Sequence, residues 1–283
     1  MMIRNPLLWG TDQFRPGAAP KPAVLPRERV TPLSGLSVGR IGMADLRDVL
    51  GKGWSDFGAC RSDVLFICAI YPIVGLVLAW VAAGDGLLPL LFPIASGFAL
   101  IGPLVGVGLY EISRQREQRG PANWATPFGV FASPSFGSIL ALGLMLTGVY
   151  LLWLLAASVI YAVTLGPEMP GSAGAFVHDV FLTGRGWAMI AMGVIVGAGF
   201  AVLVLAVSAV SFPLLLDHQV GVETAIRTSF RAVALNPRPM LAWGLIVTAG
   251  LVLGSLPCFV GLVVVLPVLG HATWHLYRKL VSG

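Results

Sequence analysis

Charged residues are scarce in this chain. Only 11% of its 283 residues are Asp, Glu, Lys or Arg, and 57% are hydrophobic, whereas soluble domains carry about 25% charged residues. The mean hydropathy of +0.86 agrees with that balance. Three cysteines without a Cys-x-x-Cys pair argue against a disulfide framework. The composition excludes an ordinary soluble domain and indicates an integral membrane protein.

Groups that carry chemistry are also missing. No Asp, Glu, Lys or Arg lies in the central part of any apolar stretch, although ion-coupled carriers place ionisable groups there. The chain has no His-Glu-x-x-His, no Gly-x-Ser-x-Gly and no phosphate-binding loop. Its basic residues are scattered among acidic ones, which argues against nucleic acid as a partner. We therefore expect no enzyme activity and no cofactor.

The apolar residues are grouped into six stretches. A hydrocarbon core of ~30 Å needs roughly 20 apolar residues per helix. We expect spans at about 64–83, 87–110, 136–165, 187–216, 240–254 and 256–277. Residues 1–41 contain six prolines and predict a disordered cytoplasmic arm. Residues 42–280 form the predicted membrane domain.

Two further segments predict amphipathic helices. In residues 42–61, Met43, Leu46, Val49 and Leu50 recur at helical spacing, and Trp54 and Phe57 continue that side. This helix either lies flat in the cytoplasmic interface or packs as a solvated helix on the spans. Residues 217–238 predict a second cytoplasmic amphipathic helix, which ends at Asn236-Pro237.

The basic residues predict the orientation. If the N-terminus is cytoplasmic, all of the 18 Lys and Arg except Arg185 lie inside. Such asymmetry is the positive-inside pattern of bacterial inner membrane proteins. It favours six spans with both termini cytoplasmic, in the plasma membrane.

A repeated motif relates two of the spans. The first copy has Gly97, Pro103, Gly106, Tyr110 and Arg114, and the second has the matching positions Gly261, Pro267, Gly270, Trp274 and Arg278. A looser third copy surrounds Pro213. The prolines lie inside the second span of each expected hairpin, where they break the helix or line a cavity. The predicted fold is an all-α membrane protein built of three Pro-kinked hairpin repeats, with cytoplasmic amphipathic helices.

Three histidines lie near the expected inner face. His271 and His275 are four residues apart on one helix face, a spacing that can bind metal or haem iron, and His218 is the third candidate. The alternative is that all three are polar interfacial residues, so the metal site stays open.

The chain resembles an uncharacterised bacterial inner-membrane family, domain of unknown function 2189. The resemblance lies in Tyr71-Pro72-Ile73-Val74-Gly75-Leu76, in Gly97-Phe98, Gly102-Pro103 and Gly108 to Arg114, and in Pro267 to Arg278. Some members are labelled as cytochrome c oxidase subunits, which implies an accessory role. A catalytic haem–copper subunit is excluded because it needs six metal-binding histidines, and this chain has four.

These features favour a non-enzymatic accessory or assembly protein that binds other membrane subunits. Its expected partners are the bilayer and other membrane proteins, and a homo-oligomer is compatible with the glycine-rich spans. Two alternatives remain: a carrier or binder of a lipid or apolar solute, and an accessory haem or metal site at the inner face.

Overall fold

The computed structural model describes residues 36–68, 88–168 and 170–282, together with isolated positions between 73 and 80. Most of the predicted arm and of the predicted span at 64–83 lies outside these residues. The elements are β1 (Ser37–Val38), α2 (Met43–Cys68), η2 (Leu88–Leu90), α4 (Leu91–Val105), α5 (Val107–Gln118), η3 (Thr126–Ala132), α6 (Phe136–Thr164), α7 (Ala173–Leu182), α8 (Gly184–Ser208), α9 (Ser211–Asp217), α10 (Val222–Leu235), α11 (Pro237–Ser255), α12 (Leu262–Leu280) and β2 (Val281–Ser282).

Four helical stretches are long and apolar enough to cross a membrane. They are Leu91–Gln118, Phe136–Thr164, Gly184–Asp217 and Pro237–Ser255, which coincide with the spans predicted at 87–110, 136–165, 187–216 and 240–254. α12 is not among them, and the first part of the span predicted at 256–277 forms turns up to residue 261. The all-helical membrane fold is confirmed, whereas six spans and a three-fold repeat stay predictions.

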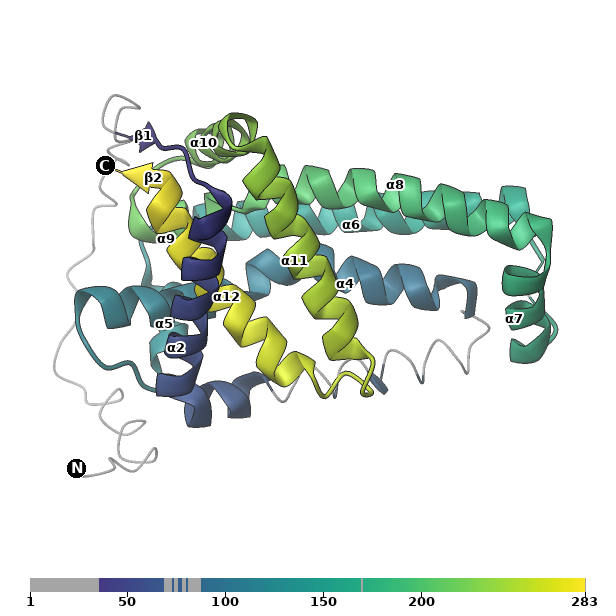
Figure 1. Cartoon of the computed structure of the whole chain (residues 1–283), viewed down its shortest axis with the longest axis horizontal. Helices are drawn as coiled ribbons and strands as arrows, with labels where there is room; N and C mark the ends of the chain where they lie inside the picture. The colour runs from purple at the N-terminus through teal and green to yellow at the C-terminus, as the bar shows by residue number, and fades with distance from the viewer. Residues whose placement is uncertain are drawn as a thin grey trace, which may run out of the picture.

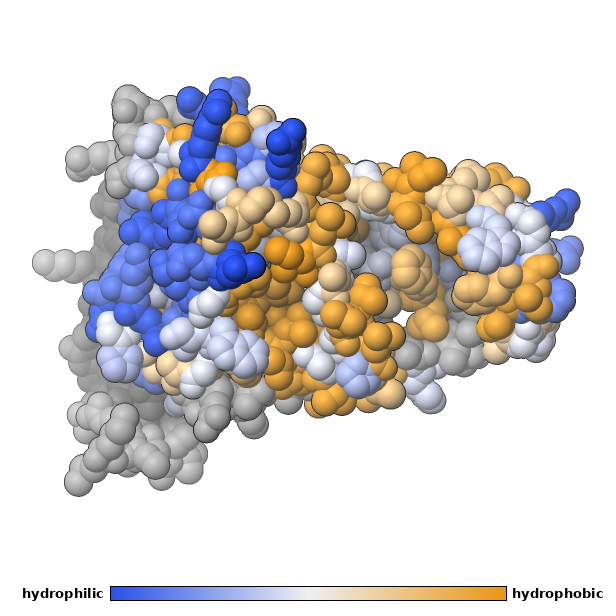
Figure 2. Space-filling view, viewed as in Figure 1, coloured by the Kyte–Doolittle hydropathy of each residue, from blue (hydrophilic) through white to orange (hydrophobic). Residues whose placement is uncertain are grey.

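The molecule has an apolar part and a polar end (Figure 2), and Figure 1 shows the arrangement of its helices. α4, α6 and α8 run along the long axis, and α6 packs on both of the others. At the other end lie α2, α5, α9, α10, the C-terminal half of α12 and the strand pair, which together we call the polar head. Figure 2 shows hydrophilic residues gathered over the polar head and hydrophobic residues over the long helices. Apolar side chains on α6, α8 and α11 are exposed and form the surface expected to contact lipid or other membrane proteins.

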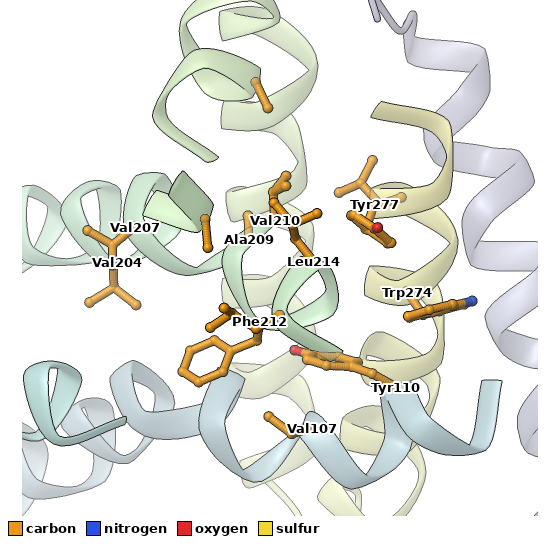
Figure 3. Close-up of a cluster of buried hydrophobic side chains, with 14 of the residues drawn as sticks. Val107, Tyr110, Val204, Val207, Ala209, Val210, Phe212, Leu214, Trp274 and Tyr277 are labelled. Carbon is orange, nitrogen blue, oxygen red and sulfur yellow. The ribbon is translucent and has the colours of Figure 1, made fainter. Parts of the chain in front are cut away.

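The buried core lies where α5, α8, α9 and α12 meet. Figure 3 shows Tyr110 of α5, Phe212 of α9 and Trp274 of α12 in one cluster of buried side chains, together with Val210 from the link between α8 and α9. Phe212 and Trp274 are fully buried. α8 ends at Ser208 and α9 starts at Ser211, after a two-residue turn. Phe212, in the first turn of α9, is part of the core.

α2 lies across the polar end and packs along α12 (Figure 1). Of the two alternatives for this segment, the structure shows the helix packed on the rest of the protein. Leu46, Val49 and Phe57 are buried as expected, but Met43 and Trp54 are each 59% exposed. The residue that faces α12 beside Val49 is Gly53, because only a glycine admits the backbone of α12 so closely.

The strand pair joins the chain that precedes α2 to the chain that follows α12. β1 and β2 are antiparallel, with Ser37 opposite Ser282 and Val38 opposite Val281. Buried Asn236, which follows α10, accepts a hydrogen bond from the amide of Ile41 at 2.8 Å and donates to the carbonyl of Gly39 at 3.0 Å. The chain entering α2 is therefore fixed to the end of α10 as well as to the C-terminus.

Candidate functional site: two polar clusters in the head

The first cluster surrounds Asp56 of α2. Asp56 Oδ2 accepts hydrogen bonds from Ser113 Oγ at 2.6 Å and pairs with His275 Nε2 at 2.9 Å. Asp56 Oδ1 forms an ion pair with Arg116 Nη1 at 2.9 Å. Ser113 Oγ also lies 2.8 Å from His271 Nδ1. These five residues, which we call the Asp56 cluster, join α2 to α5 and α12.

Hydrogen-bond roles in the Asp56 cluster fix the tautomer of His271. The single hydroxyl proton of Ser113 goes to Asp56, so Ser113 Oγ accepts from His271 Nδ1–H. Nε2 of His271 then carries a lone pair. It is buried and has no hydrogen-bond partner among the described residues.

Asp56 stays ionised despite its burial. Burial alone raises the pKa of Asp56, but the hydrogen bonds from His275 and Ser113 outweigh it and leave the pKa below its usual range. A buried carboxylate with three partners holds its neighbours firmly, because losing it would leave buried donors unpaired.

The residue types of a serine hydrolase are present in the Asp56 cluster, but their connections are not. In a catalytic triad the histidine lies between the serine and the carboxylate. Here Ser113 lies between His271 and Asp56, and its hydroxyl donates to the carboxylate. Ser113 is only 1% exposed, so a substrate cannot reach it. This geometry ties helices together and does not activate a nucleophile.

The second cluster surrounds Asp217 at the end of α9. Tyr277 Oη donates to Asp217 Oδ2 at 2.9 Å, and Gln118 donates to Oδ1 at 3.2 Å. Arg278 bridges Asp217 and Glu117, at 3.3 and 3.1 Å. Trp274 Nε1 donates to Glu117 at 2.8 Å. The Asp217 cluster thus joins α5, α9 and α12.

The structure separates the three candidate histidines. His271 and His275 belong to the Asp56 cluster, where they use different ring nitrogens, and His218 lies 3.6 Å from Asp217. Over the part of the chain that the structure describes, no group of three or more His, Cys, Asp or Glu side chains is placed to hold a metal ion. Coordination by both His271 and His275 would require Asp56 to release His275 or His275 to use its other nitrogen.

The motif glycines give room to bulky neighbours. Gly97 packs under the ring of Tyr150 on α6, and Gly106 lies under the Tyr110 ring. Gly261 contacts the backbone of Gly254, and Gly270 receives Leu109 of α5. The two copies of the motif therefore use glycine for different neighbours, and α5 and α12 pack directly on each other.

The motif prolines and arginines also differ between copies. The helix is interrupted at Gly106, three residues after Pro103, and at Ala209–Val210, before Pro213, whereas α12 runs through Pro267 without a break. Arg114 pairs with Glu111 one turn away at 2.8 Å, but Arg278 reaches two other helices.

The sequence did not predict the polar contacts made by Asp56, Ser113 and Asn236. A signal for Asp56 exists, because it lies seven residues after Val49 and therefore on the buried face of the same helix. Ser113 and Asn236 carry no such signal, since their partners come from helices far away in the chain.

Residues 91–217 match one family model, which is described as "Predicted integral membrane protein (DUF2189)". This segment, which is less than half of the chain, is similar to that family. The match runs from α4 to α9 and confirms the resemblance found at Gly97 to Arg114, whereas the DUF2189 description names no activity and no oxidase. Comparisons with curated proteins and with solved structures found no match.

Proposed function

We propose that this protein is a non-enzymatic accessory or assembly protein that binds other subunits in a bacterial inner membrane. In this proposal the stretches at 64–83 and 256–277 also cross, both termini are cytoplasmic, and the polar head faces the cytoplasm. The observation that carries it is the sparse packing of the spans. Between 17% and 29% of the most apolar stretch of each candidate span is buried within the chain.

Two further features support this assignment. The long helices leave wide apolar faces open, with Leu144, Leu155 and Ile195 each more than 60% exposed, and partner helices can pack there in place of lipid. The polar head is held by two hydrogen-bonded clusters without an accessible nucleophile, which favours a binding role over catalysis.

The test is purification of the full chain from native membranes in a mild detergent, with every co-purifying protein quantified by mass spectrometry. The proposal predicts at least one membrane protein at a fixed stoichiometry that survives a change of detergent. Respiratory-chain subunits at fixed stoichiometry would define the accessory role further.

Other outcomes of the same experiment separate the alternatives. Recovery of the protein alone under all conditions would refute the accessory role, and recovery with a defined lipid would favour the lipid carrier. A visible absorption band or stoichiometric metal would favour the histidine site.

A further inference from the structure

The outward face of α10 combines an exposed aromatic ring with arginines. α10 buries Ala225, Thr228, Ser229 and Ala232 against the rest of the polar head. Its opposite face presents Arg227, Phe230 and Arg231, and Phe230 is 44% exposed. Arg238 follows as an exposed residue in the first turn of α11. We call Arg227, Phe230, Arg231 and Arg238 the α10 surface.

Among the described residues, the charges of the α10 surface are only partly paired. Elsewhere in the polar head, Arg114, Arg116, Arg278 and Lys279 each pair with a carboxylate. On the α10 surface only Arg227 has a partner, the exposed Glu223 at 2.6 Å. None of the ion pairs among the described residues includes Arg231 or Arg238, so the surface keeps a net positive charge.

The α10 surface lies at the boundary between the hydrophilic and hydrophobic parts of the molecule. Figure 2 shows hydrophilic residues over α10 and the start of α11, next to the apolar region. Along α11 the exposed residues become apolar within a few positions, with Leu241 50% and Leu245 71% exposed. In a bilayer that covers the exposed Leu241 and Leu245 with acyl chains, Arg238 and α10 would lie at the depth of the lipid headgroups.

We propose that the α10 surface docks on anionic phospholipids, with Arg231 and Arg238 on headgroup phosphates and Phe230 at the edge of the acyl region. An interfacial helix with arginines on one side and an aromatic residue facing the bilayer is suited to this. Guanidinium groups bind phosphate oxygens through paired charge-assisted hydrogen bonds. The resulting contact depends on lipid charge and is independent of the accessory function proposed above.

The experiment measures lipid binding to the delipidated full chain in detergent by native mass spectrometry, with phosphatidylglycerol and phosphatidylcholine as separate probes. We compare the parent protein with Arg231→Gln/Arg238→Gln and with the matched control Arg47→Gln/Arg119→Gln. The control removes two exposed arginines, one on α2 and one directly after α5, which are likewise absent from the ion pairs of the described residues.

The parent protein should bind phosphatidylglycerol more tightly than phosphatidylcholine. Since each arginine contributes about fivefold near an anionic surface, the Arg231/Arg238 variant should lose about thirtyfold in phosphatidylglycerol affinity. It should leave phosphatidylcholine binding unchanged, and the control variant should resemble the parent. Phe230→Ala should weaken both lipids to a similar extent.

Three results would overturn the proposal: equal affinity of the parent for both lipids, unchanged phosphatidylglycerol binding by the Arg231/Arg238 variant, or an equal loss in the control. If the double variant does not fold, Arg238→Gln alone should show about a fivefold loss. Retention of a co-purified protein at the α10 surface, lost in the same variant, would also reject lipid as the occupant.

Discussion

Replacing Gly53 with Ala should loosen the contact between α2 and α12. A Cβ atom at Gly53 would lie 2.6 Å from the Val268 carbonyl oxygen and 2.7 Å from the Ala272 amide nitrogen. These are backbone atoms, so no side chain can rotate away, and the two helices must separate. Overpacking of this kind costs about 1–3 kcal/mol, and the backbone contacts place Gly53→Ala near the upper value.

The intrinsic preference of helices for Ala acts in the opposite direction. Ala is more favourable than Gly in a helix interior by about 1 kcal/mol. The net loss should therefore be about 2 kcal/mol, which is about a thirtyfold change in the equilibrium between docked and released α2. Native-state hydrogen exchange of the α2 amides measures this local opening directly.

Two glycines on the same helix provide controls. A Cβ atom at Gly51 or Gly58 would meet nothing within 4 Å, so Gly51→Ala and Gly58→Ala should slow exchange in α2 through helix propensity alone. If Gly53→Ala protects α2 as well as these controls do, the close approach of α2 and α12 is wrong.

Further predictions concern the two clusters and the strand pair. Asp56→Asn removes the charge that holds the partly buried Arg116 and His275, and should destabilise the protein by about 1.5–3 kcal/mol; exposed Asp48→Asn is the control, and equal shifts in thermal midpoint would contradict a special role for Asp56. Because the pKa of Asp56 is lowered by its hydrogen bonds, its stabilisation is complete above its unfolded pKa of about 3.9 and is lost as pH falls through the lower folded value. The Asp56 contribution, taken as the thermal midpoint of the parent minus that of Asp56→Asn, should therefore be constant from pH 7 to 5 and shrink below about pH 4; a decline between pH 7 and 5 would reject this assignment. Tyr277→Phe loses one hydrogen bond to Asp217, and chemical unfolding should show a free energy of unfolding lower by about 1 kcal/mol. Tyr161→Phe is the control, because it loses only an exposed hydrogen bond to the Glu168 carbonyl and should change stability less. Asn236→Ala leaves the Ile41 amide and Gly39 carbonyl without their partner, and should cost about 2 kcal/mol and speed proteolysis before α2; unchanged proteolysis would show that the strand pair suffices.

Local patterns were enough to predict the individual helices. The apolar runs at 136–165, 187–216 and 240–254 became α6, α8 with α9, and α11, because their length and composition are set within each segment. The amphipathic pattern at 217–238 likewise became α10. The segment at 42–61 was correctly predicted to be helical, but the side of this helix that is buried was predicted only in part. Gly53 lies on the buried side, and its contact with α12 could be recognised only once the partner helix was known.

Polar contacts between distant segments could not be predicted in the same way. Asp56 contacts residues 57 and 219 positions away in the chain, Ser113 and His275. Helical periodicity gives the direction of a side chain on its own helix but not the partner helix or its depth. The histidine spacing in α12 correctly placed His271 and His275 on one face, yet only the packing of α2 shows that this face meets a carboxylate.

The hydropathy of α12 illustrates how such contacts change the meaning of a polar residue. Its C-terminal half carries His271, Trp274, His275 and Tyr277 as well as Arg278 and Lys279, and together these residues lower its average hydropathy below that of the helices that qualify as spans. Yet His271, Trp274 and Tyr277 are fully buried, and their polar atoms contact Ser113, Glu117 and Asp217 of the same chain. A helix whose polar groups are satisfied by protein needs no water around it. For α12, therefore, part of the low hydropathy comes from polar groups that are enclosed by α5 and α9, and hydropathy alone is a poor measure of how deeply this helix lies in the membrane.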